Sequence, residues 1–448
     1  MGKILCRARR FSLNLVFSGL LAGCGGGGPA PPAVAAIVLD ASTASATSIR
    51  MSWTASTAGS RYRIYRDGTL LDTVSGASRS VSDTGLQSGS RHCYRITAVD
   101  GAGAAVADSN QSCAATAPLA SWAIQRVSAS PPVSQALDAQ GLDRMSFCGP
   151  RGVQFQASRA DGSFSTVSLD PAAACFDALL VVGGDGSDHI VYADTNSDQL
   201  KYATDVSGQW VVSVIPGAAG AEFPSLAIDR GDAVHVAYLL FTGHSPGAYQ
   251  LMYASDASGS WQSTLVEDTL AYPSLAVDAA GTPHIAYLGA MRADGGYPVH
   301  YRSYASGAWI DEVAAVSADP KSLVALAVTP AGRPQLVYKS LAELDYVTQV
   351  SGRWTTTRVD SFDAGAADYG RYGAYDVSLD LDSAGGPHLA YEDSSGDLKY
   401  AVLEAGRWGT VYVDTEGTQN QIKMDPGGHA RIAYAGADNL YSKLAVSP

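Results

Sequence analysis

One unit of roughly 48 residues recurs along the last three quarters of this 448-residue chain, and this repeat constrains the fold more than any other feature. Each copy carries a turn glycine, and these are Gly141, Gly186, Gly231, Gly281, Gly332, Gly385 and Gly428. A polar residue follows three residues later, or four in the third copy: Arg144, His189, His235, His284, Gln335, His388 and Arg431. Three residues further on stands an aromatic ring: Phe147, Tyr192, Tyr238, Tyr287, Tyr338, Tyr391 and Tyr434.

A second ring closes six copies: Phe164, Trp210, Trp261, Trp309, Trp354 and Trp408. The seventh copy lacks this ring, but Trp122, in the segment SWAIQRV at residues 121–127, precedes the first copy and carries the same pattern. We therefore expect an N-terminal strand to complete the last unit. Four short strands per unit, seven units and an exchanged strand predict a seven-bladed β-propeller over residues 119–448, because ring closure removes long exposed sheet edges.

Two turns of the repeat, Asp205 to Trp210 and Asp256 to Trp261, resemble the Asp-box of sialidase-like propellers. In the Asp-box the glycine stands two residues after the aspartate, whereas here it stands three after it. The resemblance implies the architecture, and its enzymatic implication would be a sialidase-like glycoside hydrolase or lyase. No serine, cysteine or paired-carboxylate motif of fixed spacing assigns a catalytic residue, so we expect a binding protein and keep the enzyme as the alternative.

The first 36 residues are typical of an exported protein. Residues 1–23 combine a basic start with an apolar run from Phe11 to Leu21 that is too short to span a bilayer. The sequence Leu21-Ala22-Gly23-Cys24 resembles the lipobox of bacterial lipoproteins, which implies cleavage before Cys24 and lipidation of its thiol. Gly25 is not the aspartate that signals inner-membrane retention in enterobacteria, so an outer-membrane or cell-surface location is expected. Residues 24–36, rich in glycine and proline, predict a flexible linker.

Short alternating strands between residues 37 and 117 predict a β-sandwich. Trp53, the strand around Tyr65 and the stretch from Leu86 to Gly103 resemble a fibronectin type III domain. The family places its corner tyrosine six residues after this leucine, where the present chain has His92. The whole chain is thus predicted to be all-β, with a fibronectin type III sandwich followed by the propeller.

Four cysteines remain after Cys24, in a compartment that permits disulfides. Their spacing predicts two local pairs, Cys93 with Cys113 and Cys148 with Cys175, with free buried thiols as the alternative.

Three long loops interrupt the repeat, and all are predicted to emerge on one face of the propeller. They span residues 239–250, 288–299 and 360–375. Variation on loops is where a repeat scaffold places function. The loops concentrate tyrosine, arginine and aspartate, which suit a glycan or a protein partner. The predicted binding residues are Tyr249, Arg292, Asp294, Tyr297, Asp368, Tyr369, Arg371, Tyr372 and Tyr375. Tolerated insertions without a ligand, as in an envelope scaffold, are the alternative.

The recurring histidines are predicted to form structural hydrogen bonds, because equivalent positions on different blades lie too far apart to share one metal ion. A weaker candidate for calcium is the run with Asp194, Asn196 and Asp198, which alternates oxygen ligands but lacks the glycine and glutamate of an EF-hand loop. No other cofactor is expected.

The formal charge of −13 becomes −17 without the four cations of residues 1–23. Such a field repels phosphate backbones, so nucleic acid is not an expected partner. Membrane contact is expected only through the lipid anchor.

Overall fold

The computed structural model describes residues 37–54, 61–128, 134–175, 177–243, 249–269, 272–320, 322–340, 343–362, 377–436 and 441–448. Within these ranges every regular element is a β-strand, which confirms the all-β prediction. The same ranges contain no helix long and apolar enough to cross a bilayer. The predicted signal peptide, Cys24 and the linker lie outside the described residues.

The N-terminal strands form a sandwich of two sheets. One sheet has the order β1 (Leu39–Thr43), β2 (Ile49–Trp53) and β5 (Ser80–Asp83). The other has the order β4 (Thr69–Ser75), β3 (Arg61–Arg66), β6 (Arg91–Val99) and β7 (Ala105–Asp108), with β8 (Ser112–Ala115) also paired to β6. Alternation along β2 turns Ile49, Met51 and Trp53 inward, where they pack against Tyr62 and Tyr94 of the facing sheet.

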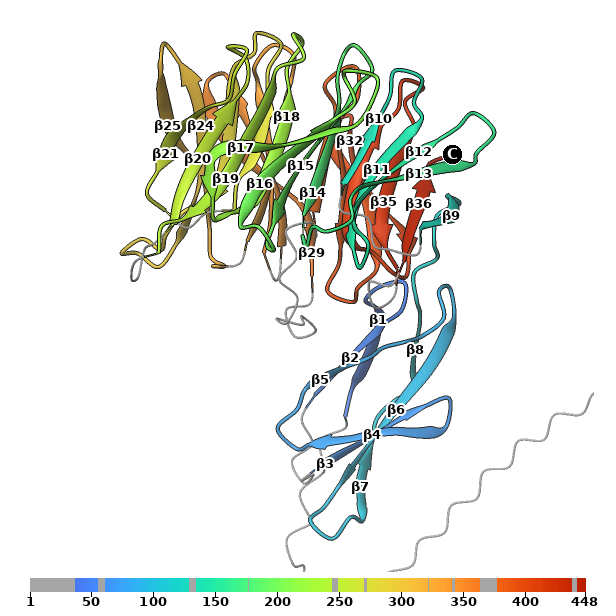
Figure 1. Ribbon diagram of the computed structural model, residues 1–448. Coiled ribbons are helices and arrows are strands. Elements are labelled where there is room, and N and C mark those ends of the chain that lie inside the picture. The colour runs from blue at the N-terminus through green and yellow to red at the C-terminus, as the bar shows by residue number, and fades with distance from the viewer. Residues whose placement is uncertain are drawn as a thin grey trace, which may run out of the picture.

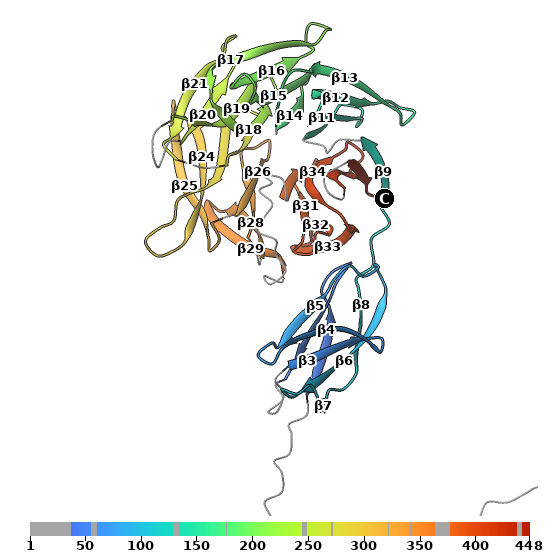
Figure 2. The ribbon, with the colours of Figure 1, turned by 60° about the horizontal axis from the view of Figure 1, so that its bottom comes forward.

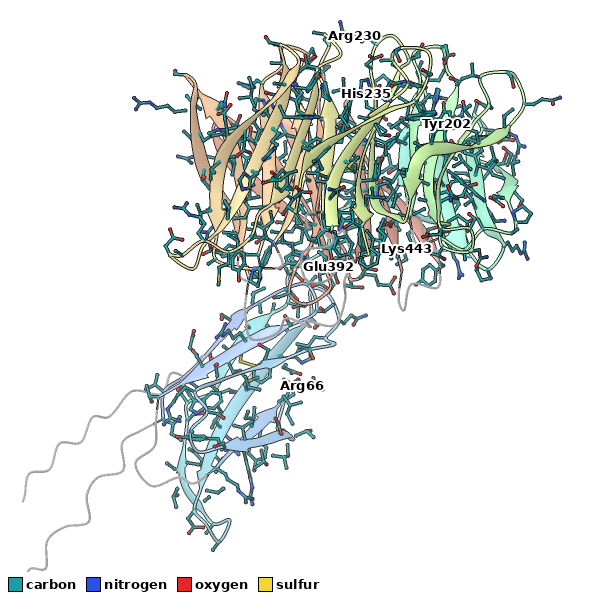
Figure 3. The ribbon with its side chains drawn as sticks, turned by 60° about the vertical axis from the view of Figure 1, so that its left-hand side comes forward. Arg66, Tyr202, Arg230, His235, Glu392 and Lys443 are labelled. Carbon is teal, nitrogen blue, oxygen red and sulfur yellow. A yellow bond between two sulfur atoms is a disulfide. The ribbon has the colours of Figure 1, made fainter. Side chains whose placement is uncertain are left out.

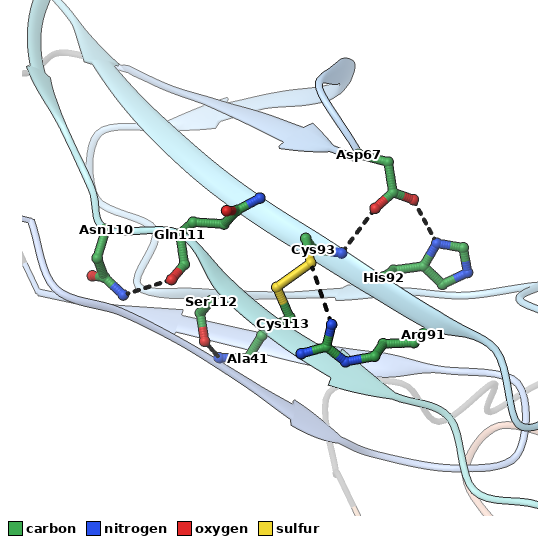
Figure 4. Close-up of a disulfide and its surroundings, with 9 residues drawn as sticks. All are labelled: Ala41, Asp67, Arg91, His92, Cys93, Asn110, Gln111, Ser112 and Cys113. Atoms are coloured by element: carbon green, nitrogen blue, oxygen red, sulfur yellow. Dashed lines mark hydrogen bonds and ion pairs between the residues drawn. A yellow bond between two sulfur atoms is a disulfide. The ribbon is translucent and has the colours of Figure 1, made fainter. Parts of the chain in front are cut away.

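Both predicted disulfides are present. Cys93 on β6 lies directly opposite Cys113 on β8, and their bond joins the two strands (Figure 4). Beside it, a ring nitrogen of His92 lies 2.7 Å from one carboxylate oxygen of Asp67, whose other oxygen accepts the Cys93 N–H at 2.9 Å. The turn between β3 and β4 is thereby tied to the disulfide-bearing strand. The second bond joins Cys148 to Cys175.

The remaining strands form seven four-stranded antiparallel sheets, which we number 1 to 7 in chain order. Sheets 1 to 3 contain β10 (Ser134–Leu137), β11 (Asp143–Gly149), β12 (Gly152–Ser158), β13 (Phe164–Asp170); β14 (Ala178–Val182), β15 (Asp188–Asp194), β16 (Gln199–Thr204), β17 (Val211–Ala219); and β18 (Ala221–Ile228), β19 (Val234–Phe241), β20 (Tyr249–Ser255), β21 (Gln262–Glu267). Sheets 4 and 5 contain β22 (Ser274–Val277), β23 (Pro283–Leu288), β24 (Tyr297–Ala305), β25 (Ala308–Ser317); and β26 (Leu323–Val328), β27 (Pro334–Lys339), β28 (Glu343–Val350), β29 (Arg353–Ser361). Sheets 6 and 7 contain β30 (Val377–Leu381), β31 (Pro387–Glu392), β32 (Leu398–Glu404), β33 (Arg407–Asp414); and β34 (Thr418–Met424), β35 (Ala430–Ala435), β36 (Ser442–Val446), β9 (Ala123–Ser128).

These sheets are arranged around a central axis as a β-propeller, with the first strand of each sheet innermost (Figure 2). The seventh sheet is completed from the N-terminal side, since β9 pairs with β36 in the register Ile124↔Ala445. Serines on the inner strands join neighbouring sheets. The Ser225 hydroxyl, for example, accepts the Leu275 N–H at 2.9 Å. Such bonds satisfy backbone groups that would otherwise face the channel unpaired.

From sheet 2 to sheet 7, the closing ring of each sheet contacts the sheet before it. An aromatic side chain on the third strand of one sheet packs against the closing ring of the following sheet, with ring centroids 4.9–5.4 Å apart. The pairs are Phe155 with Trp210, Tyr202 with Trp261, Tyr253 with Trp309, Tyr301 with Trp354, Tyr346 with Trp408, and Tyr400 with Trp122. The hydrophobic core therefore lies between the sheets.

The turn glycine of the third unit needs a correction. In the other six units the glycine has a positive φ, whereas in the third unit Asp232 does, at 61°, and Gly231 does not. Aspartate tolerates this left-handed conformation better than most residues. This shift explains why the spacing to His235 is longer by one residue in this unit.

Candidate functional site on the loop-bearing face

The two ends of the propeller differ in what they carry. Connections between second and third strands, and connections from one sheet to the next, emerge at one end, which we call the loop-bearing face. Turns between first and second strands emerge at the other. Figure 3 shows Arg230 and His235 near the end that faces away from the N-terminal sandwich, and Glu392 and Lys443 near the end that faces it.

In sheet 3 the predicted binding residue Tyr249 begins β20. It lies opposite Phe241, the last residue of β19, and their ring centroids are 5.2 Å apart. Phe241 is 50% exposed and was not among the predicted binding residues. The two side chains form an aromatic surface at the edge of the loop. Residues 244–248, in the middle of this loop, lie outside the described residues.

In sheet 4 the connection between β23 and β24 carries Arg292 and Asp294, and a third predicted residue, Tyr297, begins β24. Arg292 and Asp294 form an exposed ion pair with a nitrogen-to-oxygen distance of 3.3 Å. The Tyr297 hydroxyl lies 3.4 Å from the sulfur of Met291, whose side chain is 62% exposed. An apolar surface and a charged pair are thus side by side on one loop. We call Phe241, Tyr249, Met291, Arg292, Asp294 and Tyr297 the sheet 3–4 patch.

The third predicted loop cannot be placed. Asp368, Tyr369, Arg371, Tyr372 and Tyr375 all fall within residues 363–376, outside the described part of the chain. Their role in binding stays a prediction.

The N-terminal sandwich also meets the loop-bearing face, at sheet 6 (Figure 1). Thr47, in the turn between β1 and β2, donates its N–H and its hydroxyl to the Asp397 carboxylate at 3.2 and 2.9 Å. The Tyr412 hydroxyl donates to the Ala44 carbonyl at 3.3 Å. Burial raises the pKa of Asp397, and burial together with the neighbouring Asp397 raises the pKa of Asp393 to about 6. This junction covers the part of the face at sheet 6, while Phe241, Met291, Arg292 and Asp294 remain exposed and Tyr249 and Tyr297 are half-buried.

The recurring polar residues make hydrogen bonds within their own sheets. A ring nitrogen of His284 lies 2.6 Å from the Tyr301 hydroxyl, and His189, His235 and His388 contact the equivalent tyrosines in the same way. In sheet 5 the Tyr346 hydroxyl donates to Gln335 at 2.7 Å. Burial lowers the pKa of His284. The arrangement is that of a structural bond between second and third strands. Arg431 instead pairs with Asp143 across the seam between sheets 7 and 1.

A second repeated cluster was missed by the sequence reasoning. At the seam between sheets 5 and 6, Asp360 accepts a hydrogen bond from the Tyr391 hydroxyl at 2.8 Å and pairs with Lys399. Burial, followed by Asp360, raises the pKa of Tyr391. Equivalent clusters are Asp170 with Tyr192 and Lys201, Glu267 with Tyr287 and Arg302, and Asp414 with Tyr434 and Lys443. The signal was available, since each acid stands six residues after a closing ring.

One of these lysines, Lys201, pairs with Asp194, the first residue of the candidate calcium run. The Lys201 ammonium lies 2.8 Å from Asp194, whose carboxylate also accepts the Ala174 and Asn196 N–H groups and the Ser197 hydroxyl. Asp194 therefore sits in a lysine-paired turn. Within the described ranges no group of three histidine, cysteine, aspartate or glutamate side chains is placed to hold a metal ion.

A cavity of about 210 Å³ follows the propeller axis and is lined by the inner strands. A sialidase-like site would need arginines converging there with a carboxylate and a tyrosine. Among the described lining residues are Asp177 and Tyr272, but there is no arginine.

No protein-family model matches the chain, and no curated protein does. Among solved structures, a fungal lectin from Aleuria aurantia, described as a six-bladed β-propeller, is 12% identical, with 64% of this chain and 96% of that chain covered and a TM-score of 0.45. The Hadza microbial sialidase Hz136 is 13% identical, with 90% and 93% covered and a TM-score of 0.42. A mutant of AofleA from Arthrobotrys oligospora is 11% identical, with 67% and 92% covered and a TM-score of 0.43. No residue role is transferred from these proteins.

Proposed function

We propose that this protein is a cell-envelope binding protein whose loop-bearing face binds a glycan. The observation that carries the proposal is the sheet 3–4 patch, in which Met291 is 62% exposed next to the exposed Arg292–Asp294 pair, and Phe241, on the neighbouring sheet, is 50% exposed. Loops on a rigid scaffold commonly carry binding residues, and these two loops bear exposed apolar and charged side chains. Aromatic rings stack on the apolar faces of sugars, while paired charges bind hydroxyls.

In the proposed architecture, an N-terminal domain and a lipid anchor hold the propeller at the membrane. We take residues 37–117 as a fibronectin type III domain and the seven four-stranded sheets of residues 119–448 as the full set of blades. Residues 1–23 would direct export, and lipid on Cys24 would hold the chain at the outer membrane or cell surface. Several acyl chains anchor stably where a single chain does not.

Binding is tested with the full exported chain, starting at residue 24 with Cys24 replaced by serine, on an array of neutral and acidic oligosaccharides. The double variant Phe241→Ala/Tyr297→Ala should lose at least tenfold in affinity for the best ligand. Tyr304→Ala is the matched control, because Tyr304 is 38% exposed and lies at the end of β24, next to the turn of the opposite face. Equal binding by the double variant and the control would remove the patch as the site. Binding only to surface proteins would replace glycan by protein as the partner.

The anchor is tested separately by metabolic labelling with a fatty acid in a bacterial host. The unaltered chain should incorporate label and fractionate with membranes. Cys24→Ser should do neither, and labelling of that variant would refute lipidation at Cys24.

A further inference from the structure

The outer edge of sheet 2 differs from the outer edges of the other six propeller sheets. Each sheet ends in an outer strand, and in sheet 2 this strand is β17. No charged residue occurs between Val206 and Ala221, a segment that contains nearly all of the connection before β17 and the whole strand. The other outer strands, β9, β13, β21, β25, β29 and β33, each contain at least one charged residue. Charged side chains on an edge strand hinder its pairing with another chain, and β17 lacks this protection.

Most of the apolar side chains at the start of β17 face solvent. Val211, Val212 and Val214 are 53%, 38% and 45% exposed, whereas Ile215 is buried. An uncharged run of β-branched residues at a sheet edge favours pairing with a further strand. Pro216 follows, and because proline has no N–H to donate, it ends the segment that can pair. The segment offered to a partner is therefore Val211–Ile215.

This edge can be approached from outside the propeller. β17 pairs with β16 along one side, and along its other side it pairs with no strand of the described chain. Figure 2 shows β17 on the outer rim, on the side of the ring away from the N-terminal sandwich. The sandwich contacts sheet 6, through Thr47 and Asp397. A strand of another molecule therefore reaches β17 without displacing the sandwich.

The strand that fits this edge is β17 of a second copy. Antiparallel pairing about Ser213 places Val211 opposite Ile215, and Val212 opposite Val214. Alternate side chains share one side of a strand, so Val212 and Val214 of both copies form a cluster of four valines. The pairing brings no like charges together, which matters because two chains of net charge −13 repel each other. The same pairing through β25 would bring acidic side chains of both copies together.

We propose that two copies of this protein associate by antiparallel pairing of their β17 strands over Val211–Ile215. A two-fold axis at Ser213 makes the contact self-complementary and closed, so it produces a dimer and not a filament. One strand pair is a small contact, and interfaces that bury less than about 1,200 Å² are typically weak. The dimer should therefore dissociate on dilution.

Sedimentation velocity tests the association with the chain that starts at residue 24 and carries Cys24→Ser. Over about 1–100 µM it should show a monomer–dimer equilibrium, and Val214→Lys should raise the dissociation constant at least tenfold by placing two ammonium groups in the apolar contact. Val313→Lys on β25 is the matched control, because Val313 is 46% exposed and, like Val214, stands four residues after a closing tryptophan. A chain that stays monomeric, or a dimer that Val214→Lys weakens no more than Val313→Lys does, would overturn the proposal.

Disulfide trapping tests the register. Ser213 is exposed and lies opposite its own copy in the proposed pair, so Ser213→Cys should form a disulfide between copies, whose Cα atoms would lie within about 4.4–6.8 Å. The four native cysteines of this chain are already paired with one another. Thr357→Cys is the control, because Thr357 is exposed on β29 and, like Ser213, stands three residues after a closing tryptophan.

Non-reducing electrophoresis compares the two cysteine variants at a concentration where the dimer is populated. More cross-linking of Ser213→Cys than of Thr357→Cys supports the paired strands, and equal cross-linking rules them out. Thermal melting of Val214→Lys identifies misfolding, in which case the comparison of the cysteine variants decides the question.

Discussion

Trp122 packs edge to face against Tyr400 with their ring centroids 5.2 Å apart, although 278 residues separate them in the chain. Trp122 precedes the first sheet and immediately precedes β9, the outer strand of the last one. The contact is the same as those made by the tryptophans of the intact units. It therefore shows how an N-terminal segment closes the propeller, because this segment supplies both the outer strand and the closing tryptophan that the seventh unit lacks.

Removing the indole ring of Trp122 should lower the stability of the whole propeller. Trp122 is half-buried against Tyr400, so Trp122→Ala should lower the free energy of unfolding by about 2–4 kcal/mol, below the loss for a fully buried tryptophan. Ile124→Ala, on the same strand with 38% of its side chain exposed, should cost under about 1 kcal/mol. Urea denaturation followed by tryptophan-independent circular dichroism measures both. Equal losses in the two variants would mean that only the strand, and not the ring, closes the propeller.

The buried histidines should make the fold sensitive to mild acid. Burial lowers the pKa of His284 below its usual value of 6.5, so the unfolded chain binds the proton more tightly. Stability is present above pH 6.5 and should fall as the pH drops below it. His284→Gln copies Gln335 of sheet 5, which accepts the Tyr346 hydroxyl, and should reduce this fall. Melting temperatures at pH 7.5 and 5.5 provide the measurement, and an unchanged pH slope in the variant would contradict the prediction.

The carboxylate at the domain junction should act in the opposite direction. The pKa of Asp393 is raised from 3.8 to about 6, chiefly by burial and next by Asp397. The folded chain then binds the proton more tightly, so this group lowers stability as the pH rises from about 4 to 6. Asp393→Asn should stabilise the protein at pH 7.5 by up to about 3 kcal/mol and much less at pH 4.5. A loss of stability at pH 7.5 would show that Lys399 compensates the ionised carboxylate.

The position of the sandwich should depend on Thr47. Its N–H and hydroxyl both bind Asp397, so Thr47→Val removes one hydrogen bond and leaves a buried carboxylate short of a donor. We expect a larger radius of gyration by small-angle X-ray scattering and faster proteolysis between residues 117 and 122. Thr73→Val, on the exposed strand β4, is the control and should change neither. Identical scattering from both variants would mean that other contacts, such as Tyr412 with Ala44, fix the junction.

Local sequence patterns predicted much of the architecture. The spacing of glycines and rings predicted the order of strands, the role of Trp122 and the sides on which the long loops emerge. The two cysteine pairs could be predicted because each joins residues close in sequence. The acids six residues after the closing rings, such as Asp360, were also visible but were overlooked. The repeat could not distinguish Gly231 from Asp232, because either residue can take the left-handed position.

By itself, the sequence determined which residues repeat, and hence the strands and the aromatic contacts that recur once per unit. Only the tertiary structure decided which residues from different units meet. Thr47 and Asp397 are separated by 350 residues, and Phe223 and Tyr272 come from different sheets. A periodic pattern reports what every unit shares. The junction and the contact between Phe223 and Tyr272 depend on single residues that the closed ring brings together, so no local pattern announces them.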